Sequence, residues 1–262
     1  SRDGNWISGL NFIDKHHIGD QTHAPSLITN NPSHNKFYMM PLLLGLIGFI
    51  FTLNKATKTW WTILLLFLLT GFAIIIYLNQ KPLEPRERDY AYAASFYAFS
   101  IYIGMAVLAL YDAYKSMQWL DLGKIYGTLA GIGVVFMAVD MTAGISILYM
   151  AAIAAILHAF FIGLRNVISK EQTSGMLATA LLLPVPIIMG LQGWDDHDRS
   201  DRYTAQALAE NYLNSCDDQG IIYTNGDNDT FPLWYLQEVE EKKTSVRVCN
   251  LSLLNTDWYT EQ

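Results

Sequence analysis

Residues 144–164 read GISILYMAAIAAILHAFFIGL, and this stretch decides the class of the fold. A bilayer core about 30 Å thick is crossed by roughly 20 apolar residues of helix at about 1.5 Å per residue. Similar stretches occupy residues 38–54, 60–79, 96–112, 124–140 and 175–192. Because six of them follow one another with only short polar breaks, the sequence predicts a membrane all-α bundle of about six transmembrane helices rather than helices buried in a soluble core.

The sequence predicts three regions. Residues 1–36 form a polar loop or tail, residues 37–192 form the transmembrane bundle, and residues 193–262 begin a soluble α/β domain. In the last region, GIIYTN at 220–225 and VRVCNLSLL at 246–254 are typical of buried strands. Pro232 fits the first turn of a helix between them. Strand, helix and strand in this order predict a βαβ unit with parallel strands.

The orientation follows from lysine and arginine in the short loops. If the loops alternate sides, one side holds Lys55, Lys58, Lys115, Lys124, Arg165 and Lys170, and the other holds Lys81, Arg86 and Arg88. The positive-inside rule places the first side in the cytoplasm. Residues 1–36, the loop at 80–95, the turn at Asp140 and the region from 193 onward are then expected on the extracytoplasmic side.

Composition excludes some classes of protein. The net charge of −7 comes largely from the C-terminal region, so the chain lacks the basic surface that a nucleic-acid partner requires. Two cysteines, Cys216 and Cys249, exclude a disulfide framework and allow one bridge at most, and we favour free, partly buried thiols. The chain does not begin with Met and stops within the start of another element, so we expect it to be an internal fragment of a longer protein.

The loop QKPLEPRERDYAY at 80–92 is the most unusual segment between two spans. Pro82 and Pro85 favour extended backbone, and the charges that follow alternate in sign. Arginines in such a cluster can bind a phosphate while the carboxylates position a hydroxyl group. The alternative is a surface loop whose charges neutralise one another. The charged residues are Glu84, Arg86, Glu87, Arg88 and Asp89.

Other polar segments allow two interpretations each. Asp195, Asp196 and His197 are weak candidates for a divalent metal, although helix capping explains them better because adjacent helical residues point in different directions. Asp227 and Asp229 follow the first predicted strand, where α/β sheets bind ligands, but GDNDT is also ordinary turn sequence. Within the spans we expect His158 to be a hydrogen-bonded interior residue, and Pro184 and Pro186 to kink the last helix.

Five motifs together are similar to a bacterial family of large multi-pass proteins that carries the label "domain of unknown function 2723" and resembles protein O-mannosyltransferases. These motifs are DGNWISGLNFID at 3–14, PRERDY at 85–90, WDDHDRS at 194–200, TNGDNDTFPLWY at 224–235 and LLNTDWY at 253–259.

The resemblance implies a GT-C-type glycosyltransferase of the bacterial inner (plasma) membrane. Such an enzyme moves a sugar from a polyprenyl-phosphate donor, a membrane lipid, to an exported protein or glycan acceptor. The expected acidic base lies in an early external loop outside this chain, so the catalytic residue is unknown and the fragment alone is expected to be inactive. Beyond the donor substrate no cofactor is assured, and the use of a divalent metal stays open.

The same resemblance, read with the charges, assigns donor-phosphate binding to Arg86 and Arg88. Sugar or acceptor contacts are expected from Glu84, Asp89, Asp140, Asp227 and Asp229. Two other functions stay open: a membrane transporter, which would need more charged residues in its spans, and a structural or assembly subunit whose outer domain binds a partner.

Overall fold

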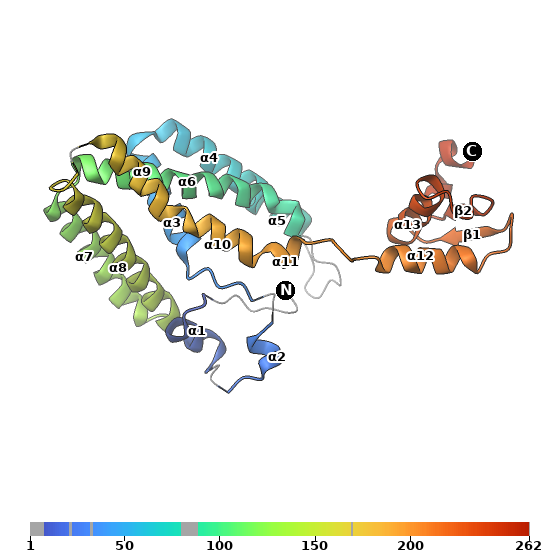
Figure 1. The fold of residues 1–262 in the computed structure, drawn as a ribbon, viewed down its shortest axis with the longest axis horizontal. Coiled ribbons are helices and arrows are strands. Elements are labelled where there is room, and N and C mark those ends of the chain that lie inside the picture. The colour runs from blue at the N-terminus through green and yellow to red at the C-terminus, as the bar shows by residue number, and fades with distance from the viewer. Residues whose placement is uncertain (1–7, 21–22, 32–33, 80–88, 169, 262) are drawn as a thin grey trace. The chain divides into compact units, whose positions relative to one another are not determined.

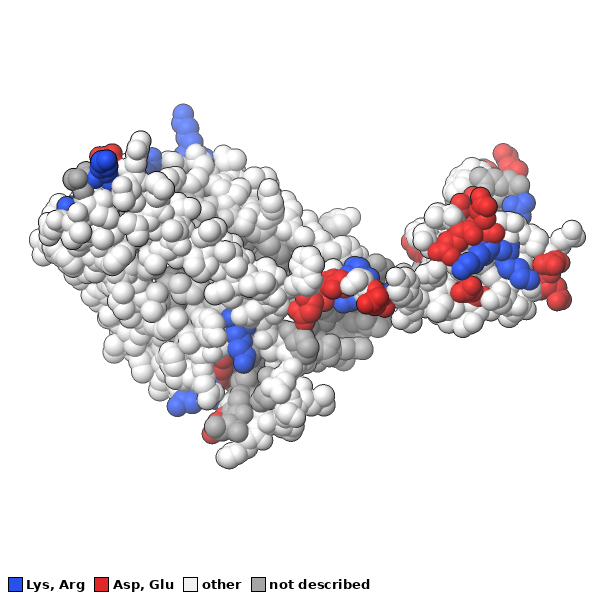
Figure 2. Space-filling view, in the orientation of Figure 1, with Lys and Arg blue, Asp and Glu red and all other residues white. Residues whose placement is uncertain are grey.

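The computed structural model describes residues 8–20, 23–31, 34–79, 89–168 and 170–261. The chain divides into a helical unit, Ser1–His197, and a smaller unit, Asp198–Gln262. Figure 1 shows the long helices of the first unit and the mixed helices and strands of the second. Figure 2 shows that charge is sparse over the visible face of the helical unit and dense on the smaller one.

The helical unit consists of long apolar helices and short connecting ones. Its elements are α1 (Asn11–Ile18), α2 (Ser26–Thr29), α3 (Met40–Lys55), α4 (Thr57–Thr70), α5 (Phe72–Leu78), η1 (Asp89–Tyr92), α6 (Ala93–Ser116), α7 (Trp119–Met137), α8 (Met141–Leu164), α9 (Glu171–Leu182), α10 (Pro184–Gln192) and α11 (Trp194–His197).

Among the described residues, five helical segments are long and apolar enough to cross a membrane, judged by length and composition. They are Thr57–Leu78, Tyr90–Ser116, Trp119–Met137, Met141–Leu164 and Glu171–Gln192. The remaining predicted span, α3, is apolar but has 16 residues. At about 1.5 Å per residue it measures about 24 Å, less than the hydrocarbon thickness of about 30 Å. Two left-handed residues, Tyr38 and Met39, end its regular backbone on the N-terminal side.

Several helices extend beyond the predicted spans. Helix α7 begins at Trp119 rather than 124, and α9 begins at Glu171 rather than 175. The prediction began both spans after Asp121 and Glu171, but charged residues are compatible with a helical first turn. In α7, Asp121 accepts a hydrogen bond from the backbone of Gln118 and caps the helix. The last span breaks at Leu183, directly before Pro184, as the two prolines predicted.

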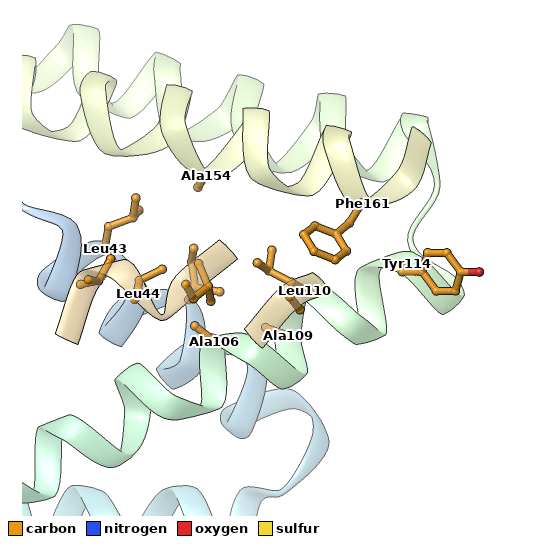
Figure 3. Packing of buried hydrophobic residues seen from close by; sticks show 12 residues of the cluster. Leu43, Leu44, Ala106, Ala109, Leu110, Tyr114, Ala154 and Phe161 are labelled. Atoms are coloured by element: carbon orange, nitrogen blue, oxygen red, sulfur yellow. The ribbon is translucent and has the colours of Figure 1, made fainter. Parts of the chain in front are cut away.

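Helix α6 lies at the centre of the unit and contacts α3, α4, α8 and α9. The buried core between these helices is rich in small residues, and Figure 3 shows Ala106, Ala109 and Leu110 of α6 beside Ala154 and Phe161 of α8. Lipid tails are as apolar as leucine, so close van der Waals packing rather than removal from water stabilises these contacts.

One glycine allows α3 to approach α6. A Cβ atom on Gly48 would lie 1.8 Å from the carbonyl oxygen of Tyr102. Only a residue without a side chain can therefore occupy this position at the observed helix separation. Two further contacts give the relative direction of the two helices: Gly45 meets Phe99, and Lys55 meets Asp112. Because the residue numbers increase together along both helices, α3 and α6 run parallel.

The ends of the helices form two groups. At one end, which we call the Lys55 end, Lys55 pairs with Asp112 at 3.1 Å and Lys115 pairs with Glu171 at 3.1 Å. Arg165 donates hydrogen bonds to the carbonyls of Ala113, Tyr114 and Met117, the last turn of α6. The basic residues that the sequence placed on one side of the membrane therefore gather at one end of the helical unit.

The opposite end, which we call the Lys36 end, holds the start of α3, the start of α8 and the end of α10. Phe12 of α1 packs edge-on against Tyr149 of α8 at 6.0 Å between ring centroids. The hydroxyl of Tyr149 donates to the carbonyl of Tyr38 at 3.3 Å. The described part of the predicted N-terminal loop thus contains two short helices, and α1 packs on α8.

The smaller unit has a two-stranded parallel sheet. Its elements are α12 (Thr204–Asn214), β1 (Ile221–Thr224), α13 (Asp227–Glu238), β2 (Arg247–Asn250), η2 (Leu253–Asn255) and α14 (Asp257–Thr260). Ile221 pairs with Arg247 and Thr224 with Asn250, in parallel register. Helices α12 and α13 pack together over a small core that includes Leu213, Leu233 and Leu236.

The strand–helix–strand order is confirmed, but α13 begins earlier than predicted. It starts at Asp227, so Pro232 lies inside the helix rather than in its first turn. Gly226 has a φ of 120°, a conformation that glycine adopts without strain, and it turns the chain directly from β1 into α13. The strands are also shorter than predicted, with four residues each.

Candidate functional site

A polar pocket of about 510 Å³ lies at the Lys36 end of the helical unit. Two stretches far apart in sequence form it, one before α3 and one at the end of the last span. The lining residues are Asn30, Asn31, His34, Asn35, Lys36, Leu191, Gln192, Trp194 and Asp195.

Gln192 joins the two stretches. Its side-chain oxygen accepts a hydrogen bond from the backbone N–H of Lys36 at 2.5 Å, and its side-chain nitrogen donates to the carbonyl of Lys36 at 3.2 Å. The amide thus pairs with both backbone groups of one residue, as a neighbouring strand would. This pairing positions the loop before α3 against the end of α10.

The lining of the pocket combines amide side chains with the charged residues Lys36 and Asp195 and the ring of Trp194. Asparagine side chains both donate and accept hydrogen bonds, as hydroxyl groups do, whereas the Gln192 amide is already paired with the backbone of Lys36. The indole of Trp194 is 69% exposed, so its ring is available to cover an apolar ligand face. A few polar groups with one aromatic wall are typical of small-molecule sites.

The arginine loop predicted to bind phosphate falls outside the described residues. This applies to Glu84, Arg86 and Arg88, while Asp89 lies in η1 with its side chain outside the description. On the described flanks of this loop, Gly71, which lies between α4 and α5, meets Ser95 near the start of α6, and α5 contacts η1. The described residues before and after the loop therefore lie at the Lys36 end.

Asp140 lies in the turn between α7 and α8 and caps α8. Its carboxylate accepts a hydrogen bond from the backbone N–H of Ala143 at 2.9 Å, the usual role of an N-cap aspartate. The side chain is exposed and does not line the polar pocket. The structure thus gives this candidate a structural role as the cap of α8.

Of the acidic run after the last span, Asp195 lines the polar pocket. The side chain of Asp196 is outside the description, and His197 contacts the carbonyl of Gly193 through Nδ1 at 2.8 Å. Hydrogen bonds from Ser200 lower the pKa of Asp198 below its usual value. Among the described residues, no three His, Cys, Asp or Glu side chains gather closely enough to hold a metal ion.

Asp227 and Asp229 lie in the first turn of α13, directly after β1, and both are exposed. This position is the carboxyl edge of the parallel sheet, where ligands bind in larger sheets of this type. The two carboxylates also favour the helix through its N-terminal dipole. The structure places them on the smaller unit at the predicted edge.

A buried polar network supports this edge. The hydroxyls of Thr224 and Thr230 lie 2.7 Å apart, and the Asn250 side chain donates to the Thr230 hydroxyl at 3.0 Å. The Asn250 side chain also accepts from the backbone N–H of Ser252 at 2.8 Å. These contacts link the last residues of both strands to the loops that follow them.

Sequence reasoning missed most of the polar pocket. Its residues come from two stretches that only the folded chain brings together, and none of them forms a local motif with the others. It identified Asp195 as a weak metal candidate, and it included Trp194 as the first residue of the motif WDDHDRS. His158 was predicted correctly: its Nδ1 lies 2.9 Å from both the Tyr126 hydroxyl and the Ala154 carbonyl.

Fold and pocket together define a class, namely a multi-helical membrane protein with a polar pocket at one end and a small β1–α13–β2 unit after its last apolar helix. A family model described as TMEM260-associated domain 2 matches residues 205–262, which lie within the smaller unit. Comparison with curated proteins and with solved structures gives no match.

Proposed function

We propose that this chain is part of an integral-membrane glycosyltransferase. The enzyme moves a sugar from a polyprenyl-phosphate donor to an exported acceptor, a protein or a glycan. The observation that carries the proposal is the amide-rich pocket with Trp194, situated at the end of the helical unit that also holds the described flanks of the arginine loop. A lipid-linked sugar needs both features, a phosphate site at the membrane surface and a sugar site beside it.

The similarity of five sequence motifs to the family that resembles O-mannosyltransferases supports the same reaction class. In this proposal α3 is a sixth span that completes the bundle by tilting or by local thinning of the bilayer, which costs little per ångström of mismatch. The Lys55 end faces the cytoplasm because it gathers the basic loops. The Lys36 end and the smaller unit, as the start of an α/β domain, then face the extracytoplasmic side of the bacterial inner membrane.

In the proposed enzyme different residues bind the phosphate, the sugar and the acceptor. Arg86 and Arg88 hold the donor phosphate and neutralise the leaving group as negative charge develops on it. Trp194 and the amides around Gln192 hold the sugar. Glu84 and Asp89 of the helical unit, and separately Asp227 and Asp229 of the smaller unit, are the proposed acceptor or sugar contacts. The acidic base is proposed to come from a part of the protein outside this chain.

Donor binding by the complete protein tests the roles proposed for the arginines and for Trp194. We expect Arg86→Gln with Arg88→Gln to weaken binding of both a polyprenyl-phosphate sugar and the sugar-free polyprenyl phosphate. Trp194→Ala should weaken only the sugar-bearing lipid, because the ring contacts the sugar. Trp119→Ala, which removes an exposed tryptophan from the start of α7 at the opposite end, is the control.

Two results would overturn the proposal. One is unchanged donor affinity in the double arginine variant with melting behaviour close to that of the parent. The other is an equal effect of Trp194→Ala and Trp119→Ala on the two lipids, which would leave the polar pocket without a role in sugar binding.

A further inference from the structure

A second cavity lies within the membrane part, separate from the polar pocket. It is half open and has a volume of about 580 Å³ between α3, α6, α7 and α8. On α3 its lining follows one stripe from Leu43 to Lys55, at the spacing of one helical face. Twelve steps of about 1.5 Å make this stripe about 18 Å long, so the cavity is long enough for an extended hydrocarbon chain.

Most of the lining is apolar, as an acyl or alkyl chain requires. Leu46 and Ile50 come from α3, Leu129 from α7, and Ile147 and Met150 from α8. The Lys55 end of the cavity is polar, with Asp112, Ser116 and Asp121 among its lining. The cavity is thus amphipathic along its length, which matches a molecule with a tail and a polar head.

His158 lines the cavity, and one of its two ring nitrogens makes no hydrogen bond within the described part of the chain. The residue lines the cavity and is 8% exposed. Its Nδ1 makes both contacts, to Tyr126 and to Ala154, whereas Nε2 has no hydrogen-bond partner among the described residues. A ligand group that hydrogen-bonds to Nε2 would therefore add an interaction that the described residues do not supply.

The nature of that group follows from the charges and from the imidazole. A hydroxyl group both donates and accepts, so it satisfies Nε2 whichever ring nitrogen carries the hydrogen. An anionic head would meet the carboxylates of Asp112 and Asp121, while the single lysine in the lining, Lys55, is already paired with Asp112. The cavity therefore disfavours a phosphate or a carboxylate.

We propose that this cavity binds an uncharged lipid with one long chain and a hydroxyl head, with the hydroxyl hydrogen-bonded to His158. This site lies toward the Lys55 end and is independent of the donor site proposed at the Lys36 end. An experiment can therefore contradict one of the two proposed sites without contradicting the other.

Three probes with the same C18 chain test the inference: oleyl alcohol, oleate and the corresponding hydrocarbon. A photoactivatable oleyl alcohol is crosslinked to the purified complete protein, and the unlabelled probes compete. We expect crosslinks on α3, α7 and α8, and competition by the alcohol about fivefold to tenfold better than by the hydrocarbon, the value of one hydrogen bond of about 1 kcal/mol. Oleate should compete worst.

Two variants distinguish the contribution of the ligand's hydroxyl head to binding from that of its hydrocarbon tail. His158→Phe should remove the preference for alcohol over hydrocarbon while the hydrocarbon still competes. Ile50→Trp, at a half-exposed lining position, should lower competition by both. Leu53→Trp on the same helix lies outside the lining and is the control for the tryptophan.

The inference is overturned if oleate competes as well as the alcohol, or if the alcohol preference survives in His158→Phe. Crosslinks spread evenly over the lipid-facing helices would also overturn it. So would crosslinks between protein chains at the lining residues, which would show that protein rather than lipid covers the cavity.

Discussion

The side-chain amide of Gln192 forms two hydrogen bonds with the backbone of Lys36, a residue 156 positions earlier in the chain. This pairing attaches the loop before α3 to the end of the last apolar helix. It therefore fixes the polar pocket, whose residues come from these two stretches.

Gln192→Ala should loosen the loop before α3. Each lost hydrogen bond costs about 0.5–1.5 kcal/mol, so the backbone amide of Lys36 should exchange its hydrogen faster by about tenfold. Hydrogen–deuterium exchange of the segment at 34–38 measures this. Gln192→Glu keeps the acceptor and loses the donor, so its effect should be smaller, and equal exchange in the parent and both variants would contradict the pairing.

Gly48→Ala should destabilise the helical unit. The added methyl group would meet the Tyr102 carbonyl at 1.8 Å, so α3 must move away from α6. Overpacking of this kind costs about 1–3 kcal/mol. Gly104→Ala is the matched control because a Cβ there meets nothing within 4 Å. Thermal melting in one detergent compares the two, and similar melting temperatures for both variants would contradict the close helix contact.

Thr230→Val should weaken the carboxyl edge of the small sheet. The change removes the hydroxyl that contacts Thr224 and accepts from Asn250, and it leaves a buried amide donor unsatisfied at about 1–3 kcal/mol. Exchange of the β1 and β2 amides in the intact chain should rise accordingly. Thr244→Val, at an exposed position, should leave these amides unchanged. Protection that is equal in both variants would show that the network does not hold the edge.

The sequence predicted the parts of the fold that repeat along the chain. Long apolar runs locate the membrane helices, and paired strand signals locate β1 and β2. It could not place the ends of α6, α7 and α9, because Lys115, Asp121 and Glu171 form ion pairs or caps that only the folded structure supplies. It also misplaced the start of α13, since the turn at Gly226 shortens the connection from β1.

Prediction of the site was limited for a different reason. Charged clusters such as Asp227 and Asp229 are visible as local motifs, and the structure places them at the expected sheet edge. Asp140 stood out in the sequence because it interrupts an apolar region, but its carboxylate caps α8. The polar pocket depends on a contact between Lys36 and Gln192, and nothing in the local sequence around either residue indicates the other.

The proposed orientation makes a prediction about labelling. Thr244→Cys lies in the smaller unit and Lys58→Cys lies near the Lys55 end, and both positions are exposed. In a background with Cys216→Ser and Cys249→Ser, a membrane-impermeant thiol reagent added outside spheroplasts should modify only the cysteine at 244. Inverted vesicles should give the reverse. Modification of position 58 from outside would show that the orientation is the opposite of the proposed one.

Sugar transfer by the complete protein tests the central claim most directly. The protein is reconstituted with a radiolabelled polyprenyl-phosphate sugar and a mixture of exported proteins and glycans, and label in the water-soluble acceptor is measured. We predict transfer by the complete protein, loss of transfer in Arg86→Gln with Arg88→Gln, and no transfer by residues 1–262 alone, because the base required for activating a hydroxyl is expected outside them. If the complete protein binds the donor but the label stays on the lipid, the result would contradict the account. Turnover by residues 1–262 alone would place the base within these residues. Asp140 and Asp89 would then be the first positions to substitute.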